Sequence, residues 1–309
     1  MRKTGWFGGV FLAGVLFLSA ATLLAAKPAP AGSETVTMTI TAVGKKDNPP
    51  PVVEKKDVRL YQEKERTKAE DWRKGKTLYL AVLIDDSLDS AIANQWDDLK
   101  SFLMAQPDTT QIAVAYARNG AAMVAQDFTS DHALAVKALR IPVDNSGAFT
   151  SPYLALQDWI KRWPQSGERG SILLFSSGID YFRGRFDLID PDVDTAIEQA
   201  QKKNINIWTI YAPDSGHWRW RNYALFISQS FLSRVSEETG AESYSLGYGP
   251  PVTLKPYFDE IHTHLNNQYL LAFKGRGGGK GRFARVDVNT ELSGVQFLAA
   301  PRVFLPPTK

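Results

Sequence analysis

The feature that most constrains the fold is a short, uninterrupted apolar run at residues 78–84, which ends in acidic and hydroxyl side chains. A run of this length and character indicates a strand that is buried on both faces. Strand-like and helix-like segments then alternate as far as residue 265. This alternation predicts a doubly wound α/β domain, with a mostly parallel sheet that is covered by helices on both faces. The polar residues after the first strand are expected at the carboxyl edge of the sheet, where such domains build their sites.

The expected elements of this domain are separated by short connections. Strands are expected at residues 78–84, 111–117, 122–128, 171–178, 205–211 and 242–245. Helices are expected at residues 91–104, 131–140, 152–163, 193–203, 228–239 and 254–265. The segment 122–128 follows its predecessor after a hairpin-like turn, so we expect it to be an antiparallel strand at the edge of the sheet.

The two ends of the chain carry shorter strand patterns. Apolar residues alternate with threonines over residues 34–43, and a second short strand is expected at 58–62. Two strands alone do not make a stable sheet. The C-terminal part offers partners at residues 268–273, 282–288 and 294–299. We therefore expect a small β-sandwich built from residues 34–76 and 266–309, with the α/β domain, residues 77–265, inserted between them.

Residues 1–31 have the layout of a secretory signal. Arg2 and Lys3 precede an apolar run over residues 6–26, and a proline-rich polar stretch follows. The apolar run is long enough to cross a membrane once, so cleavage and membrane anchoring both stay open. We expect an exported protein that is periplasmic, part of the cell envelope or secreted, and that contacts the membrane only through this segment.

The composition excludes several function classes. The chain of 309 residues has a formal net charge of only +3, and its basic residues are scattered, which argues against a nucleic-acid partner. It contains no cysteine, so disulfides and thiol nucleophiles are excluded. His262 and His264 are two residues apart and do not form a zinc pair of the i, i+4 type. We name no catalytic residue and expect a protein that is not an enzyme.

Three motifs in a fixed order give the chain a resemblance to a known family. The segment Asp85-x-Ser87-x-Asp89 after an apolar strand resembles the Asp-x-Ser-x-Ser signature of von Willebrand factor type A domains. A glycine- and threonine-containing loop at 145–150 and a buried strand that ends in Ser-Ser-Gly-Ile-Asp at 176–180 follow it. Together with the flanking strands, the resemblance extends to the exported VWFA-related proteins of acidobacteria and covers nearly the whole mature chain. It implies a recognition or adhesion module.

The resemblance also implies a metal-ion-dependent adhesion site for Mg²⁺ or Mn²⁺, since hard oxygen ligands suit such ions. Carried over residue by residue, the ligands are Asp85, Ser87, Asp89 and Thr150. The sequence departs from the family pattern twice. Asp89 stands where a second serine is expected, and Ser177 replaces the expected aspartate of the loop after the central strand, with Asp180 as a potential substitute. A weak metal site and a metal-free, degenerate site both stay open, and the lost carboxylate favours the degenerate one.

A second candidate for partner binding is the run Trp218-Arg219-Trp220-Arg221. Exposed tryptophan and arginine side chains are enriched in the residues that dominate binding at protein interfaces. The alternative is that the two tryptophans pack against the β-sandwich or between the domains.

These features lead us to expect an exported, non-enzymatic recognition, adhesion or scaffolding module that binds an extracytoplasmic protein or glycan. The alternatives are a hydrolase of cell-envelope material and a membrane-anchored factor for envelope assembly.

Overall fold

The structure of the chain is a computed structural model. It describes residues 34–45, 50–143, 149–183, 189–213, 221–245, 252–277 and 279–307, without the side chains of 221–224. The expected export segment 1–31 lies outside this description, as do Trp218, Arg219, Trp220 and the side chain of Arg221. No helix within the described ranges is long and apolar enough to cross a membrane.

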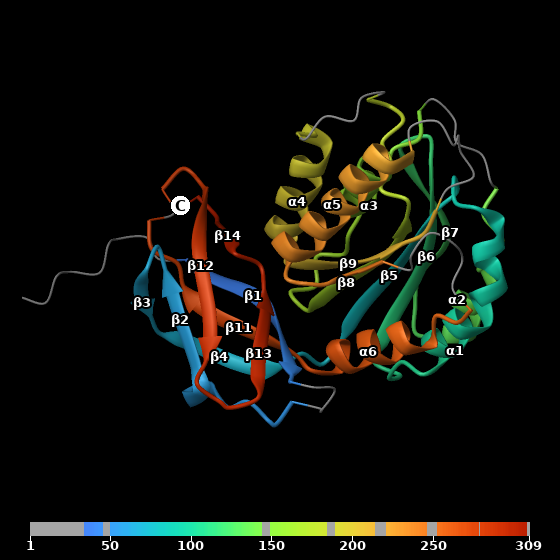
Figure 1. The fold of residues 1–309 in the computed structure, drawn as a ribbon. Helices are drawn as coiled ribbons and strands as arrows, with labels where there is room; N and C mark the ends of the chain where they lie inside the picture. The colour runs from blue at the N-terminus through green and yellow to red at the C-terminus, as the bar shows by residue number, and fades with distance from the viewer. Residues whose placement is uncertain are drawn as a thin grey trace, which may run out of the picture. The chain divides into compact units, whose positions relative to one another are not determined.

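A six-stranded sheet forms the centre of the α/β part, with the strand order β10-β9-β8-β5-β6-β7 (Figure 1). The strands are β5 (Leu78–Asp85), β6 (Thr110–Arg118), β7 (Ala121–Thr129), β8 (Arg169–Ser176), β9 (Ile205–Tyr211) and β10 (Ser243–Ser245). All neighbouring strands are parallel except β7, which pairs antiparallel with β6 at one edge. The expected doubly wound sheet with an antiparallel edge strand is therefore confirmed.

Helices cover both faces of this sheet. They are α1 (Trp96–Met104), α2 (His132–Lys137), α3 (Pro152–Lys161), α4 (Pro191–Lys203), α5 (Arg221–Thr239) and α6 (Lys255–Asn266). Successive side chains of a strand point to opposite faces. Leu80 and Val82 of β5 accordingly pack in one core with residues of α1, α2 and α6. Ala81 and Leu83 pack in a second core with residues of α3, α4 and α5.

Three helices differ from the sequence-based expectation by three residues or more at one end. The helix expected over 228–239 already begins at Arg221, as α5. The helix expected from residue 91 begins with a 3-10 segment, η2 (Ser90–Gln95), before α1. The helix expected over 131–140 already ends at Lys137. The backbone N–H of Arg140 donates to the hydroxyl of Tyr116 at 2.6 Å, and Pro142 disfavours helical geometry at the residue before it.

Two four-stranded antiparallel sheets combine strands from both ends of the chain, in the orders β13-β1-β11-β4 and β14-β12-β2-β3 (Figure 1). The elements are β1 (Thr35–Gly44), η1 (Lys55–Asp57), β2 (Val58–Gln62), β3 (Glu65–Thr67), β4 (Ala69–Lys74), β11 (Gln268–Lys274), β12 (Arg282–Thr290), β13 (Val295–Ala299) and β14 (Arg302–Leu305). Strand β1 pairs with both β11 and β13, so the N-terminal strand lies inside a sheet whose other members are mostly C-terminal. The expected sandwich of strands from both ends is confirmed.

Strands β3, β4 and β14 were not expected from the sequence. The segment Ala69–Lys74 is mostly charged and mostly exposed, so it lacks the alternating pattern of a half-buried strand. Its one large apolar side chain, Trp72, stacks on Tyr269 with ring centroids 4.5 Å apart and donates a hydrogen bond to the Val53 carbonyl.

Residues Gly32–Lys309 form one compact unit, so the sandwich and the α/β part are in contact. Arg302 of β14 pairs with Glu238 of α5 at 2.9 Å, and the Thr39 N–H of β1 donates to Asn204 after α4 at 2.6 Å. These contacts hold the sandwich against the ends of α4 and α5.

Candidate functional site

Asp85 lies at the carboxyl end of the central strand β5 and is fully buried. One oxygen of its carboxylate accepts hydrogen bonds from the N–H and the hydroxyl of Ser87, at 3.0 and 2.7 Å. The other oxygen accepts from the hydroxyl of Ser176, at the end of β8, at 2.8 Å. Both oxygens are therefore bonded within the protein, and the carboxylate joins the loops that follow two neighbouring strands.

The next residue, Asp86, forms an ion pair that sequence analysis did not single out. Its two carboxylate oxygens lie 2.7 and 2.8 Å from the guanidinium nitrogens of Arg140, in a bidentate arrangement. The guanidinium also lies 3.7 Å above the ring centroid of Tyr116. The hydrogen bonds that Arg140 donates to the Asp86 carboxylate are the main reason that the pKa of Arg140 is raised. This pair fixes the segment after α2 beside the end of β5. No local pattern links the two residues, which are far apart in the sequence.

Asp89, which stands in place of the second serine, serves the start of η2. Its carboxylate accepts a hydrogen bond from the Ala91 N–H at 2.9 Å, as the residue that caps a helix N-terminus does. Its own N–H donates to the Pro213 carbonyl after β9 at 3.1 Å. The Asp89 side chain is therefore used to hold the loop between β5 and α1.

Thr150 and Ser177 are buried in the loops that face β5. The Thr150 carbonyl accepts hydrogen bonds from the N–H groups of Tyr181 and Phe182, at 2.9 and 3.2 Å. The Ser177 hydroxyl accepts a long hydrogen bond, 3.4 Å, from the Ile179 N–H. The loop before α3 and the loop after β8 are thus bonded to each other through backbone groups.

Asp180 does not join Asp85. Its carboxylate accepts hydrogen bonds from the Ser151 hydroxyl at 2.6 Å and from the Arg183 N–H at 3.1 Å. Its nearest acidic neighbours are Asp190 and Asp192, and carboxylate oxygens of the three residues lie within 4.8 Å of one another. Burial raises the pKa of Asp180, and the charges of the two other aspartates add to this effect. Arg183 offsets part of the repulsion, with its Nε 2.7 Å from Asp192.

The three carboxylates that the sequence suggested for a magnesium site do not converge on one point. Mg²⁺ requires near-octahedral oxygen ligands. The Asp85 carboxylate is hydrogen-bonded to two serines, and the Asp89 carboxylate caps the start of η2. The Asp180 carboxylate belongs to a separate acidic group. In the described part of the chain, two groups bring three acidic or histidine ligand atoms within 4.8 Å of one another, and neither contains Asp85 or Asp89.

The same loops carry exposed apolar side chains, which sequence analysis did not identify. They are Ile141 (61% exposed), Val143 (46%), Phe149 (64%), Phe182 (47%) and Ile189 (75%). We call these five residues the apolar rim. The rings of Phe149 and Phe182 lie 6.4 Å apart. Apolar residues in loops follow no helical or strand period, so the sequence pattern does not distinguish them.

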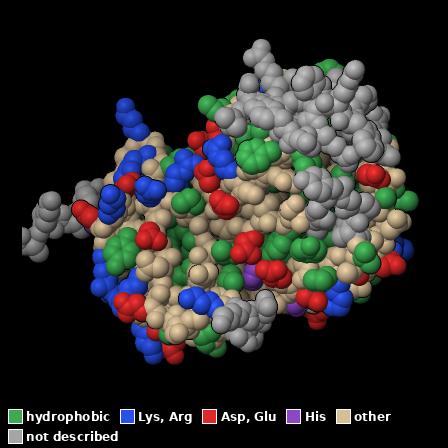
Figure 2. All heavy atoms as spheres, in the orientation of Figure 1, with side chains coloured by type: hydrophobic (Ala, Val, Ile, Leu, Met, Phe, Trp, Pro, Cys, Tyr) green, Lys and Arg blue, Asp and Glu red, His purple; other side chains and the backbone are tan. Residues whose placement is uncertain are grey.

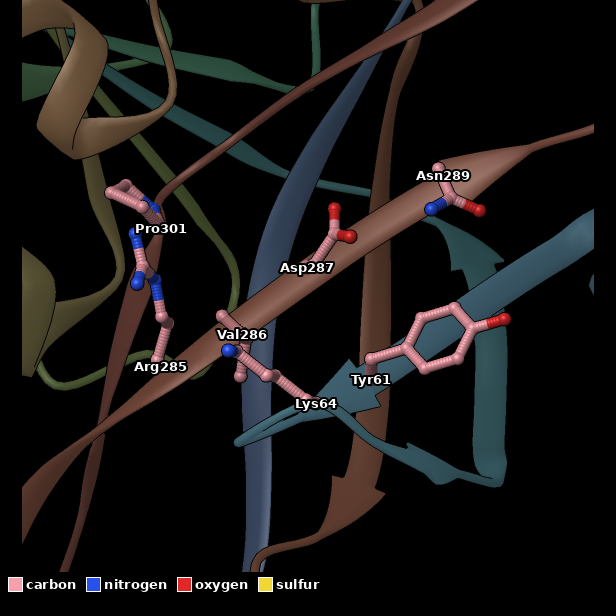
Figure 3. A pocket seen from close by; sticks show the side chains of 7 residues that line it. All are labelled: Tyr61, Lys64, Arg285, Val286, Asp287, Asn289 and Pro301. Carbon is pink, nitrogen blue, oxygen red and sulfur yellow. The ribbon is translucent and has the colours of Figure 1, made fainter.

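A hollow lies on the β-sandwich, over β2 and β12 (Figure 3). It has a volume of about 610 Å³ and is lined by Tyr61, Lys64, Arg285 and Asp287, among others. Figure 3 shows Tyr61 and Arg285 extending away from each other. Ligand sites usually combine an apolar cavity with a few convergent polar groups, and these side chains do not converge.

Comparisons with known proteins were made by sequence and by structure. No protein-family model and no curated protein sequence matches this chain. An aerotolerance-related membrane protein from Bacteroides fragilis aligns with a TM-score of 0.45 at 12% identity, over 61% of this chain and 98% of that one. The VWA domain of SpRpn10 aligns with a TM-score of 0.39 at 14% identity, over 59% and 94%. Proximal thread matrix protein 1 from the mussel byssus aligns with a TM-score of 0.41 at 15% identity, over 65% and 49%.

The order of the elements in the chain agrees with the sequence-based expectation. A central parallel strand is followed by the Asp85-x-Ser87 loop, an antiparallel strand closes one edge, and the loop with Thr150 precedes the helix that leads into the next central strand, β8. These are the features on which the resemblance was based, and helices cover both faces as it implied. The part of the chain from β5 to α6 therefore has the doubly wound α/β fold, with the element order, that the resemblance to von Willebrand factor type A domains implied.

Proposed function

We propose that the chain is an exported, non-enzymatic recognition module, and that the loops at the carboxyl edge of the six-stranded sheet bind a partner without a metal ion. Type A domains are mostly interaction and adhesion modules. The observation that carries the proposal is the exposed pair Phe149 and Phe182 of the apolar rim, whose ring centroids lie 6.4 Å apart in two loops that are hydrogen-bonded to each other.

The apolar rim supports binding of a protein rather than a charged small molecule. Exposed apolar side chains that cluster at one place mark interaction surfaces more often than isolated ones do. Aromatic residues such as Phe149 and Phe182 supply large contact areas at protein interfaces. We therefore propose a protein ligand that presents apolar side chains. A glycan that stacks on the two rings is the second ligand class.

The hydrogen bonds around Asp85 support a structural role for this residue. A serine nucleophile needs a base that is itself oriented by a third group. Here the hydroxyls of Ser87 and Ser176 both donate to Asp85, and Ser176 also accepts from the Gly178 N–H at 2.9 Å. This network ties the loops together and so keeps the binding surface in one arrangement.

Export is proposed on the N-terminal sequence, in which Arg2 and Lys3 precede the apolar run at residues 6–26. A reporter enzyme that is active only outside the cytoplasm, fused after Lys309, tests this part. We expect an active fusion. A fusion that is well expressed but inactive contradicts export.

The binding part is tested by capture from an envelope extract of the organism that carries the chain. Immobilised full chain is compared with the double variant Phe149→Ser/Phe182→Ser and with the control Phe226→Ser, which alters an exposed phenylalanine of α5. Loss of a dominant interface residue costs about 2 kcal/mol or more, roughly a 30-fold loss of affinity. We expect a protein that the native chain and the control retain, in EDTA as well as in Mg²⁺, and that the double variant loses.

Equal retention by the double variant contradicts the proposed surface, and loss in EDTA contradicts metal-free binding. Conversion of envelope material by the native chain, without stable retention, supports a hydrolase instead.

A further inference from the structure

We propose that Glu242, Glu260 and His264 bind one divalent transition-metal ion, for which Zn²⁺ is the best-suited candidate. Glu242 directly precedes β10, while Glu260 and His264 lie in the last turns of α6. The site lies beside β10, the edge strand of the sheet, and strands β9 and β8 separate it from β5, which carries Asp85. It is therefore separate from the proposed binding surface and does not depend on it.

The distances among the three side chains suit a common ion. One ligand atom from each residue lies within 4.8 Å of those of the other two. The His264 Nδ1 and the nearer Glu242 oxygen are 3.5 Å apart. Two ligands on one tetrahedral zinc, each bound at about 2.0–2.1 Å, are separated by roughly 3.4 Å. This pair is thus already at the spacing of two zinc ligands, and Glu260, one helical turn before His264 and on the same face, completes the group.

The imidazole of His264 is the second, independent observation. The residue is only 4% exposed, and its Nδ1 makes no hydrogen bond to any described group. A buried polar atom without a partner costs free energy, so such atoms in native proteins call for an explanation. The ring is held in place by stacking on Trp208, with centroids 5.4 Å apart. A metal ion bound at Nδ1 would satisfy this atom without moving the ring.

The Glu242 carboxylate also has a hydrogen-bond donor outside the group of three ligands. The Tyr244 hydroxyl donates to the Glu242 carboxylate at 3.3 Å, which is the kind of outer hydrogen bond that orients a metal ligand.

The site is accessible from solvent. Glu260 is exposed, and Glu242 also lines a hollow of about 450 Å³ between β10, α5 and β13. Figure 2 shows acidic side chains beside a histidine at the surface, below the centre of the view. Imidazole nitrogen and carboxylate oxygen together suit Zn²⁺ and its neighbours rather than Mg²⁺ or Ca²⁺. Three protein ligands leave a fourth position for water.

Sequence analysis missed this group because it compared the two histidines of α6 with each other. His262 is bonded elsewhere, through contacts of 3.1 Å with Gln106 and 2.9 Å with Asn266. The informative spacing is Glu260-x-x-x-His264, a single turn of helix. Glu242 comes from another element, and only the fold brings it to this pair.

Isothermal titration calorimetry of the full chain with Zn²⁺ tests the proposal. The variants are Glu260→Gln, which alters an exposed side chain and should not affect folding, and His264→Gln. The matched control is Asp259→Asn, which removes the same charge from the neighbouring position of α6, where Lys255 is the ion-pair partner. Loss of an outer-shell partner alone lowers metal affinity about 10–100-fold, so we expect loss of a ligand to lower it by about 100-fold or more.

We expect one Zn²⁺ per native chain, weakened binding in both ligand variants, and unchanged binding in Asp259→Asn. Saturating Zn²⁺ should also raise the thermal midpoint of the native chain but not that of Glu260→Gln. The proposal is overturned if the native chain binds no Zn²⁺, or if Glu260→Gln and Asp259→Asn bind it equally well.

Discussion

Asp180 is a buried carboxylate that a hydroxyl and a backbone amide hold in place, with two further aspartates close by. Burial raises its pKa above the usual 3.8, so folding favours the protonated form of this residue. The contribution of Asp180 to stability is therefore present below its usual pKa and is lost as the pH rises through the raised pKa.

Replacement of Asp180 by asparagine removes this pH-dependent loss. We expect the free energy of unfolding of Asp180→Asn, minus that of the native chain, to increase as the pH is raised from about 4 to about 7. Urea denaturation across this range measures it. Asp108→Asn, at an exposed position, controls for the loss of one surface charge. If the two chains differ in free energy of unfolding by the same amount at every pH, the raised pKa of Asp180 is contradicted.

The sequence placed some site residues correctly because their positions depend on one strand. Asp85 and Ser87 follow an apolar strand directly, so their location at the carboxyl edge of the sheet was predictable. The neighbours of Asp180 in the folded chain depend on the path of the loop after β8. The neighbours of Glu242 depend on how α6 packs against β10. No local pattern determines such paths.

Gly240 shows how one residue controls the contact between two elements. It ends α5 with a φ of +79°, and a Cβ at this position would lie 2.6 Å from the backbone nitrogen of Ala300, after β13. Only glycine fits both the left-handed conformation and the close approach of the sandwich backbone.

Gly240→Ala should therefore destabilise the chain more than Gly294→Ala, which has the same backbone strain but no close neighbour. Gly294 provides this comparison, because its φ is +80° and nothing lies within 4 Å of its Cβ position. Left-handed strain costs roughly 1–2 kcal/mol in either variant, and the clash at Gly240 adds about 1–3 kcal/mol. Chemical denaturation gives both free energies of unfolding. Equal losses would show that the backbone of β13 moves away freely.

Most elements were predictable because their apolar patterns are strong. The six strands of the central sheet and the helices on both of its faces have the expected order, and the differences are confined to element ends. Strands β3, β4 and β14 were missed because they are short or mostly charged, so pairing with neighbours rather than their own pattern places them in the sheets.

The whole molecule depends on strands from both ends of the chain. In the sheet β13-β1-β11-β4, the N-terminal strands β1 and β4 flank β11 on its two sides. A chain that begins at Lys76 lacks both, which leaves the backbone groups of β11 unpaired and uncovers apolar side chains such as Leu271 and Phe273.

We expect the chain that begins at Lys76 to be less soluble, and to have a lower thermal midpoint, than one that begins at Gly32. Unpaired, apolar sheet edges promote association between molecules. Sedimentation of the soluble fraction and thermal denaturation compare the two chains. Identical solubility and midpoints would show that the C-terminal strands do not need the N-terminal ones.

The central claim of the proposal is that the carboxyl edge of the six-stranded sheet binds a partner without a metal ion, because Asp85 is hydrogen-bonded to serines and a serine occupies position 177. Calorimetric titration with Mg²⁺ of the native chain, Ser177→Asp and Asp85→Ala tests it most directly. Added carboxylate charge strengthens hard-ligand sites. We predict no measurable Mg²⁺ binding by the native chain or by Asp85→Ala, and measurable binding by Ser177→Asp. Mg²⁺ binding by the native chain that Asp85→Ala abolishes would contradict the account.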